Sequence, residues 1–308
     1  MAMVRAGGLR HHVERLAPEG VSRRPPVVVF LHGAFIDTLA SFYFTLAPAF
    51  AAHGRATVMY DLRGHGRTER PGSGYRVEDF TTDLVALLDA LGLTEPVHLV
   101  GNSFGGTLAF DFAVHHPDRV ASVTAVEACP VNPGWADAMA GALHRATETL
   151  PEDQALAWFT EQYGTVSSTR TGDPAHDARI ARLGRNAGRL IKATTIARDL
   201  PRSRRPPAHR LASLACPVLL INGEHGLVAA EAAYLTTALP RCRRVVVPGH
   251  KHSVLVEAPA EVSRVTLAWL DEHAPARPAA GAPDAALARL APGASGVRPA
   301  RPATGSGR

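Results

Sequence analysis

A serine near the middle of this chain lies in a pattern that makes its hydroxyl a candidate nucleophile. Ser103 is the central residue of Gly-Asn-Ser-Phe-Gly, residues 101–105, which follows an apolar run and precedes a helix-like segment. In that context the G-x-S-x-G pattern predicts a sharp strand-to-helix turn with an exposed serine. Glycines at 101 and 105 remove side chains that would collide in such a turn. We therefore interpret Ser103 as a nucleophile that attacks an acyl carbonyl.

A serine hydroxyl is a weak nucleophile at neutral pH and needs a base within hydrogen-bonding reach. Among fifteen histidines, we predict that His252 is this base. It follows the expected strand Arg244–Val247, so it lies in a loop at the end of a strand, from which an imidazole can reach Ser103. His250, two residues earlier, is the competing candidate.

Apolar runs alternate with helical stripes along much of the chain. The segment Val27–Leu31 is apolar at every position, which is typical of a strand buried on both faces. The other expected strands are Ala56–Asp61, Val97–Val100, Val120–Glu127, Val218–Asn222 and Arg244–Val247, with Leu9–Leu16 as an edge strand. Helices are expected at Ser41–Ala52, Val77–Leu91, Thr107–His115, Ala229–Leu239 and Ala260–His273. This alternation predicts an α/β fold with a mostly parallel central sheet and helices on both faces.

The alternation stops between Cys129 and about Pro207, where only helical stretches are expected: Ala136–Leu150, Gln154–Tyr163 and Ala175–Ile196. Helices inserted over the carboxyl end of a parallel sheet would form a cap. We therefore expect a core in two parts, 1–128 and 208–274, and a helical cap at 129–207. Residues 275–308, rich in Ala, Pro and Arg, carry few large apolar side chains and form an expected disordered tail.

Four motifs occur together in one order: His32-Gly33, the segment 61–68 (DLRGHGRT), the serine pattern at 101–105 and the segment 252–259 (HSVLVEAP). Together they resemble the α/β-hydrolase family over about residues 9–273. The resemblance implies an α/β-hydrolase fold in which Ser103 is the nucleophile and His252 the base. It also implies that residues 61–68 are a structural turn outside the site, and His32 is not assigned a catalytic role.

Two backbone N–H groups are the expected donors to an oxyanion. Attack on a carbonyl creates a negative oxygen that needs preorganised donors. The N–H of Phe104 directly follows the nucleophile, and the loop after the first buried strand offers the N–H of Ala34.

The acid that would orient His252 is where the chain departs from the family's common pattern. Most members carry an aspartate three residues after the glycine that ends the penultimate strand, and here that position is Gly226. Glu127, at the end of a neighbouring strand, is the favoured substitute, because the segment 223–240 is similar to haloalkane dehalogenases that take their acid from the earlier strand. Glu224 and a missing acid remain open alternatives. Those dehalogenases use an aspartate at the position of Ser103, so their reaction does not carry over.

Charge and composition narrow the classes of function. The net charge is +5, and residues 275–308 hold five arginines and one aspartate, so 5 − 1 = +4 of it lies there. Outside this tail the sequence has no basic stripe interleaved with aromatic residues. We therefore expect no binding of nucleic acid. Three scattered cysteines predict neither disulfides nor a zinc site, and we expect no metal and no cofactor. No stretch reaches the roughly 18 apolar residues of a membrane span, and no secretory signal is recognised, so a cytoplasmic location is expected.

These observations predict a serine hydrolase that cleaves an ester, thioester or lactone of a small apolar substrate through an acyl-enzyme on Ser103. An acyltransferase, a carbon–carbon hydrolase or a lyase on the same three residues is an alternative. A non-catalytic small-molecule binder is another, motivated by Gly226. Aromatic residues of the expected cap could line an apolar pocket, although core packing explains them equally well: Trp135, Trp158, Phe159 and Tyr163.

Overall fold

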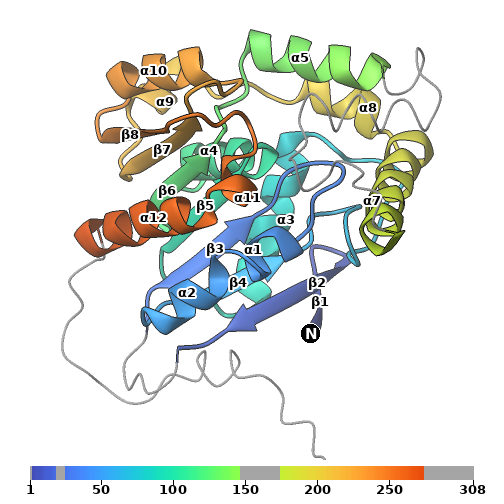
Figure 1. Ribbon diagram of the computed structural model, residues 1–308, viewed down its shortest axis with the longest axis horizontal. Helices are drawn as coiled ribbons and strands as arrows, with labels where there is room; N and C mark the ends of the chain where they lie inside the picture. The colour runs from blue at the N-terminus through green and yellow to red at the C-terminus, as the bar shows by residue number, and fades with distance from the viewer. Residues whose placement is uncertain (1, 19–24, 146–173, 274–308) are drawn as a thin grey trace, which may run out of the picture.

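The computed structural model describes residues 2–18, 25–145 and 174–273 and contains one eight-stranded sheet (Figure 1). Its strands lie in the order β1-β2-β4-β3-β5-β6-β7-β8. Six strands, from β4 to β8 in that order, run parallel, whereas β1 and β2 are antiparallel to their neighbours. The strands are β1 (Ala2–Ala6), β2 (Leu9–Leu16), β3 (Val27–Leu31), β4 (Ala56–Tyr60), β5 (Val97–Asn102), β6 (Val120–Val126), β7 (Val218–Gly223) and β8 (Cys242–Val247). The expected mostly parallel sheet is confirmed.

Helices pack on both faces of this sheet. One face carries α3 (Val77–Ala90), α4 (Phe104–His115) and α10 (Ala229–Ala238), whose apolar side chains form one buried cluster with the sheet. The other carries α1 (Ala40–Tyr43), α2 (Ala47–Ala52), α11 (Val254–Glu257) and α12 (Pro259–His273), which form the second cluster. The strand β3 shows why its sequence is apolar throughout. Val29 and Leu31 belong to the first cluster, and Val28 and Phe30 to the second.

Two sequence expectations are wrong. The strand Leu9–Leu16 is not at the edge, because β1 pairs with it and occupies the edge itself. A two-residue turn of Gly7 and Gly8, both with positive φ (55° and 83°), joins the two strands, as hairpins of this kind require. The single helix expected at Ser41–Ala52 is two helices, α1 and α2. Pro48 lies in the first turn of α2, where its missing N–H and its ring prevent continuation from α1.

Between β6 and β7 the described residues form helices and no strand. They are α5 (Pro133–His144), α7 (Pro174–Ala193), α8 (Ile196–Asp199) and α9 (Ala208–Ala212), with a 3-10 turn at Leu200–Arg202. Figure 1 shows α5, α8 and α7 along one edge of the molecule, and α7 borders a small cavity together with the loops that follow β3 and β4. The domain limits, including a cap at 129–207, stay predictions. The expected helix 154–163, residues 146–150 and the tail 275–308 lie outside the described residues.

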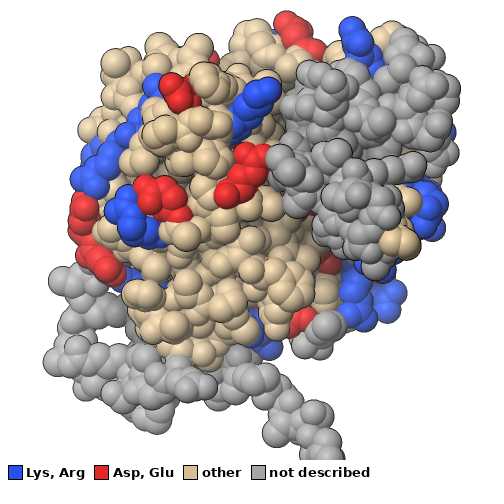
Figure 2. Space-filling view, viewed as in Figure 1, with Lys and Arg blue, Asp and Glu red and all other residues tan. Residues whose placement is uncertain are grey.

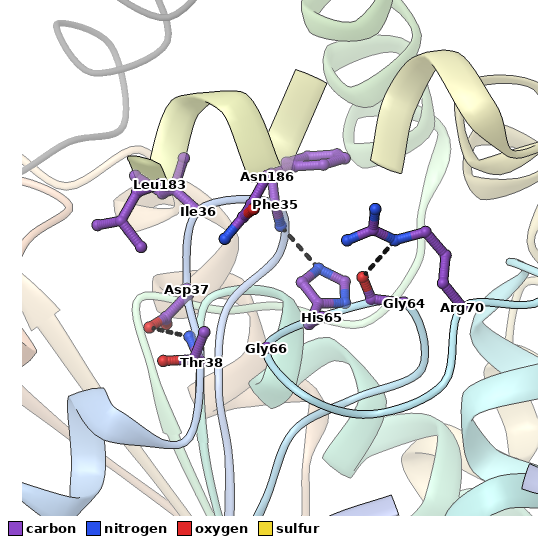
Figure 3. Close-up of a pocket in the computed structure, with 10 residues that line it drawn as sticks. All are labelled: Phe35, Ile36, Asp37, Thr38, Gly64, His65, Gly66, Arg70, Leu183 and Asn186. Atoms are coloured by element: carbon purple, nitrogen blue, oxygen red, sulfur yellow. Dashed lines mark hydrogen bonds between the residues drawn. The ribbon is translucent and has the colours of Figure 1, made fainter. Parts of the chain in front are cut away.

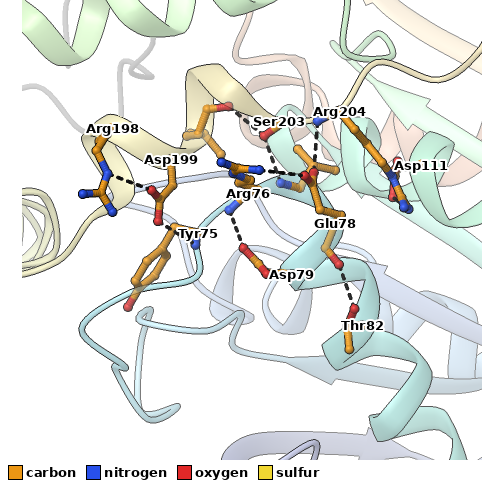
Figure 4. Close-up of polar contacts among 12 residues, drawn as sticks. Tyr75, Arg76, Glu78, Asp79, Thr82, Asp111, Arg198, Asp199, Ser203 and Arg204 are labelled. Atoms are coloured by element: carbon orange, nitrogen blue, oxygen red, sulfur yellow. Dashed lines mark hydrogen bonds and ion pairs between the residues drawn. The ribbon is translucent and has the colours of Figure 1, made fainter.

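Polar contacts hold the end of this helical region on the core (Figure 4). The guanidinium of Arg204 donates to both carboxylate oxygens of Asp111 on α4, at 3.1 and 2.9 Å. These hydrogen bonds raise the pKa of Arg204 above its ordinary value. The Ser203 hydroxyl accepts the N–H of Val77 at the start of α3, at 2.9 Å. The chain leaving the helices is therefore attached to α3 and α4.

Charged side chains of both signs lie on the surface (Figure 2). Along α12 and β8 they form ion pairs, of which Arg243–Glu272 and Arg264–Glu261 are examples. At the opposite edge in Figure 2, where α7 lies, basic side chains gather, and Arg182, Arg185 and Arg189 are exposed there. Among the described residues, no helix is both long enough and apolar enough to cross a bilayer.

Candidate active site

The strand order reverses direction at β3, which places a topological switch point at the carboxyl ends of the parallel strands. From β3 the chain passes to β4 on one side, and β5 then returns to the other side of β3. The loops that follow β3 and β5 therefore diverge, and in open α/β sheets such a switch point is where ligands bind. Ala34 lies in the loop after β3, Ser103 follows β5 and Glu127 follows β6.

Ser103 lies in a tight turn between β5 and α4. Its backbone has φ 50° and ψ −118°, far from the helical conformation of the residues that follow. The turn brings the backbone at 101 against the backbone at 105: a Cβ added to Gly101 would lie 2.3 Å from the Gly105 carbonyl oxygen. A Cβ on Gly105 would lie 1.9 Å from the Leu31 carbonyl oxygen. Both glycines are therefore required by close approach of the backbone, as the pattern indicates.

His252 reaches Ser103 from the far end of the chain. It lies between β8 and α11, and its Nε2 is 3.0 Å from the Ser103 hydroxyl oxygen. On the opposite side of the ring, Nδ1 is 3.2 Å from Oε2 of Glu127. A carboxylate only accepts hydrogen bonds, so Nδ1 carries the proton and the Nε2 lone pair faces the serine hydroxyl. The three side chains form one hydrogen-bonded row.

Glu127 is a buried carboxylate with both oxygens in use. Its side chain has no solvent exposure. Oε1 accepts the N–H of Gly223 at 2.7 Å, and Oε2 accepts from His252. The backbone is held as well, because the Glu127 N–H donates to the Ile221 carbonyl at 2.8 Å. Hydrogen bonds to both oxygens offset the cost of removing this charge from water.

Gly226 lies against the Glu127 carboxylate. A Cβ at this position would lie 2.1 Å from Oε1 and 2.6 Å from both Oε2 and Cδ. Most family members carry an aspartate at the position of Gly226. A side chain there would occupy the space that the Glu127 carboxylate fills, so the two cannot be present together. A glycine at 226 therefore leaves the room that the Glu127 carboxylate needs.

The competing candidates lie elsewhere. His250 is half-buried, and its Nδ1 donates to the Pro248 carbonyl at 2.7 Å. Glu224 has a side chain that is 53% exposed, and it accepts the N–H of Gly249 at 2.9 Å. Both stabilise the loop that carries His252, and neither side chain hydrogen-bonds Ser103 or Glu127.

Residues with strained backbone conformations lie in and next to this site. In the described part of the chain, three residues other than glycine have positive φ: Phe35 (65°), Ser103 (50°) and Glu127 (48°). Such conformations cost of order 1–3 kcal/mol each and persist where surrounding contacts determine the backbone, commonly at functional sites. Ser103 and Glu127 each have their N–H bound to the neighbouring strand at 2.8 Å, which supplies those contacts.

The two expected oxyanion donors, the N–H groups of Ala34 and Phe104, have no hydrogen-bond acceptor among the described residues. In the loop after β3, the Gly33 N–H donates to Asp37 at 2.7 Å and the Phe35 N–H donates to Nε2 of His65 at 2.9 Å. No described residue accepts a hydrogen bond from the Ala34 N–H between them. The Phe104 N–H is at the first position of α4, where helix N–H groups have no partner within the helix and favour negative charge.

His65 and His32 are buried imidazoles next to this loop. Their ring centroids are 5.2 Å apart, and both residues are at most 3% exposed. Burial, together with the neighbouring His32, lowers the pKa of His65 from 6.5 to about 3. His65 is therefore neutral at physiological pH, with its Nδ1–H donating to the Arg63 carbonyl.

The pH dependence of stability should reflect this buried histidine. Between pH 6.5 and about 3 the unfolded chain binds a proton at His65 that the folded protein does not. Stability must then fall as pH falls through this window, by at most about 1.4 kcal/mol per pH unit from this residue. We expect His65→Gln, which does not titrate, to have a shallower fall between pH 6.5 and 4 in urea unfolding. Parallel curves for the two proteins would contradict this expectation.

Sulfur chemistry is not favoured at the site. Cys129 lies two residues after Glu127, and burial raises the pKa of its thiol to about 12. Burial also raises the pKa of Cys216 and of Cys242 to about 11 each. Thiolates, the reactive form, are therefore disfavoured at all three positions.

Two contributors are missed by the sequence analysis. The Gly223 N–H orients Glu127, although the sequence marks this glycine only as the end of a strand. His65 accepts a hydrogen bond from the loop of Ala34, although the segment 61–68 is assigned to a structural turn. The glycines beside His65 indicate the tight turn, but no sequence signal indicates what its imidazole contacts. Trp158, Phe159 and Tyr163 lie outside the described residues, whereas Trp135 packs against the first apolar cluster.

Comparisons with known proteins agree with the fold. Residues 26–259 match the model of a family described as having the alpha/beta hydrolase fold. A 2-(acetamidomethylene)succinate hydrolase of Mesorhizobium japonicum is 27% identical over 256 residues, which cover 80% of this chain and 88% of that relative. A 2-hydroxy-6-oxo-2,4-heptadienoate hydrolase of Pseudomonas putida is 38% identical over 119 residues, 38% of this chain and 41% of that relative.

Among solved structures, a membrane phospholipase A superposes with a TM-score of 0.74 at 24% sequence identity, covering 89% of this chain and 86% of its own. At that identity the likeness concerns the fold alone. The family model, by contrast, matches most of the chain and spans every parallel strand from β3 to β8. The chain is therefore a member of the α/β-hydrolase family of enzymes.

Proposed function

We propose that this protein is a serine hydrolase that cleaves an ester, thioester or lactone of a small apolar substrate. The observation that carries the proposal is the row formed by Ser103, His252 and Glu127, with contacts of 3.0 and 3.2 Å. Ser103 is the nucleophile, His252 the general base and Glu127 the orienting acid in this assignment.

The proposed reaction begins with attack of the Ser103 oxygen on the acyl carbonyl carbon. The hydroxyl proton passes to Nε2 of His252, and the carbonyl π electrons move to its oxygen. When the tetrahedral intermediate collapses, the bond to the leaving group breaks, and His252 gives its proton to that group. Water then repeats the sequence on the acyl-enzyme and releases the acid, which regenerates Ser103.

Backbone donors would stabilise the intermediate. The N–H of Phe104 and the N–H of Ala34 are the proposed oxyanion donors, and neither has a hydrogen-bond acceptor among the described residues. An amide without a protein partner is available to a developing negative charge, whereas the neighbouring N–H groups of Gly33 and Phe35 are already bound. Removing one donor of this kind typically lowers kcat by about 10²–10³-fold.

A carbon–carbon hydrolase is the alternative that a specific finding favours. The Pseudomonas putida relative is named as a hydrolase of 2-hydroxy-6-oxo-2,4-heptadienoate, and its match covers less than half of either chain. The same three side chains would serve that reaction, as they would an acyltransferase or a lyase. Product analysis with and without an added acyl acceptor separates these reactions. The hypothesis of a non-catalytic binder rested on the missing acid at Gly226. That glycine leaves space for the Glu127 carboxylate, so it no longer supports the hypothesis.

Labelling with a fluorophosphonate probe tests the proposal, because the probe phosphonylates activated serines. We expect mass spectrometry to locate the probe on Ser103 in the wild-type protein, with no labelling in Ser103→Ala. Hydrolysis of p-nitrophenyl butyrate should fall in the same variant by about 10⁶-fold, to the residual rate that substrate binding and the oxyanion donors alone supply. Folded wild-type protein that neither reacts with the probe nor turns over the ester would overturn the assignment of Ser103.

A further inference from the structure

His32 and His65 make a reciprocal set of hydrogen bonds between two loops. His32 belongs to the loop after β3, and its Nε2 accepts the N–H of Leu62 in the loop after β4, at 2.9 Å. His65 belongs to the loop after β4, and its Nε2 accepts the N–H of Phe35 in the loop after β3, also at 2.9 Å. Each loop thus sends one imidazole to the backbone of the other.

The second nitrogen of each ring fixes its tautomer. Nδ1 of His32 lies 2.6 Å from the Gly33 carbonyl oxygen, and Nδ1 of His65 lies 2.8 Å from the Arg63 carbonyl oxygen. A carbonyl oxygen accepts only, so both Nδ1 atoms carry the proton, and both Nε2 atoms are lone-pair acceptors. Because each Nε2 receives a backbone N–H, neither ring can bind a further proton without losing that hydrogen bond.

These bonds determine the orientation of the Ala34 N–H. The Gly33 carbonyl and the Ala34 N–H belong to one planar trans peptide unit, so they point in opposite directions. His32 holds that carbonyl. The flanking peptide units are held too, one through the Gly33 N–H on Asp37 and the other through the Phe35 N–H on His65. The hydrogen bonds of these peptide units therefore fix the direction of the Ala34 N–H, which has no acceptor among the described residues.

On the side of α7 the loop after β3 borders an unfilled space. A small cavity lies there, lined by Phe35 and Ile36, by His65, and by Leu183 and Asn186 of α7 (Figure 3). Figure 3 shows the His65 ring pointing at the Phe35 N–H, and both residues line this cavity. Phe35 also has a positive φ of 65°, a strained conformation that requires a fixed partner. The hydrogen bond to His65 supplies one.

We propose that His32 and His65 are positioning residues that hold the Ala34 N–H in the orientation an oxyanion requires. The inference rests on the proposed serine hydrolase function. It assigns a role in the reaction to the segment 61–68, which otherwise serves as a turn. Both imidazoles act as neutral acceptors, and neither touches the substrate.

Two amide variants of His65 separate its two hydrogen bonds. In His65→Gln the longer side chain brings Oε1 to about the place of Nε2, so an acceptor for the Phe35 N–H remains. In His65→Asn the shorter side chain reaches only the place of Nδ1, where its NH₂ can serve the Arg63 carbonyl and the Phe35 N–H is left without an acceptor. Both variants bury a neutral amide, so they are matched in polarity. His98→Asn is the control, since His98 is a buried histidine of β5 that hydrogen-bonds Ser122 away from this loop.

The measurements are kcat and KM on p-nitrophenyl butyrate and the rate of Ser103 labelling by the fluorophosphonate, whose oxygen occupies the oxyanion position. We expect His65→Asn to lower kcat and the labelling rate by about 10²-fold with KM within about threefold. His65→Gln should recover both to within about tenfold of wild type. A merely structural role would lower the melting temperature of all three variants without this split between kcat and KM.

The outcomes are distinct. Equal kcat values and labelling rates for His65→Gln and His65→Asn, in folded proteins whose wild type labels at Ser103, would overturn the positioning role and leave the proposed function intact. A comparable loss in His98→Asn would also overturn it, because the effect would then come from loss of any buried imidazole. Wild-type protein that fails to label at Ser103 would instead overturn the proposed function, and the positioning role with it.

Discussion

Replacing Glu127 by glutamine should lower kcat on an activated ester by about 10⁴-fold, although the side chain keeps its size and position. The reason is the tautomer of His252. In the wild-type protein Oε1 of Glu127 accepts the Gly223 N–H, and Oε2 accepts the proton on Nδ1 of His252. Nε2 then presents its lone pair to the Ser103 hydroxyl proton.

A glutamine at this position has one oxygen and one NH₂ group. The Gly223 N–H needs an acceptor and is buried, so it takes the oxygen. The NH₂ group then faces Nδ1 of His252, which must become the acceptor, and the ring proton moves to Nε2. A protonated Nε2 cannot remove the proton of Ser103. The loss should appear in kcat, with KM little changed, because no group that binds substrate is altered.

The matched control is Glu224→Gln, which makes the same substitution in the other candidate acid. Its side chain is exposed and contacts the Gly249 N–H, so we expect kcat within about threefold of wild type. Kinetics of both variants on p-nitrophenyl butyrate, with circular dichroism to verify folding, make the comparison. Full activity in Glu127→Gln, or a large loss in Glu224→Gln, would show that the orienting acid is not Glu127.

Replacing Gly226 by alanine should lower kcat by about 10²-fold or more. The added Cβ would lie 2.1 Å from Oε1 of Glu127, far inside contact distance, so the carboxylate must move away from His252. The backbone of Gly226 does not have the positive φ that favours glycine, so the effect comes from this contact and not from the conformation of the chain. A displacement of about 1 Å at an orienting group is sufficient for a loss of this size.

Gly141→Ala is the control for this substitution, because a Cβ there meets no atom within 4 Å. We expect it to leave kcat unchanged. A double variant tests whether the two acid positions are interchangeable. Glu127→Ala removes the orienting acid and should lower kcat. Adding Gly226→Asp to this variant should restore part of the lost kcat, because the aspartate enters the space that the glutamate leaves. Unchanged kcat in Gly226→Ala, or no recovery in the double variant, would contradict the shared space.

Much of the architecture follows from local sequence. The segment Val27–Leu31 is apolar at consecutive positions, and a strand covered on both faces is the arrangement that buries all of them. The glycines around Ser103 predict the tight turn, because no larger residue could occupy those positions. Where tertiary pairing decides, local sequence fails: β1 is short and half-exposed, and only its pairing with β2 makes it a strand.

The chemistry of the site is determined at both levels. By itself, the sequence determined that a serine occupies a strand-to-helix turn and that a histidine follows the last strand, because both depend on local pattern. It favoured Glu127 over Glu224 only through a resemblance to other proteins, and it left Glu224 open, because the two carboxylates lie at the ends of adjacent strands. Only the tertiary structure decided which carboxylate approaches His252, since that depends on how β6, β7 and β8 align and on the space left at Gly226. The role of His65 likewise depends on two loops meeting, a contact between residues 30 apart that no local pattern encodes.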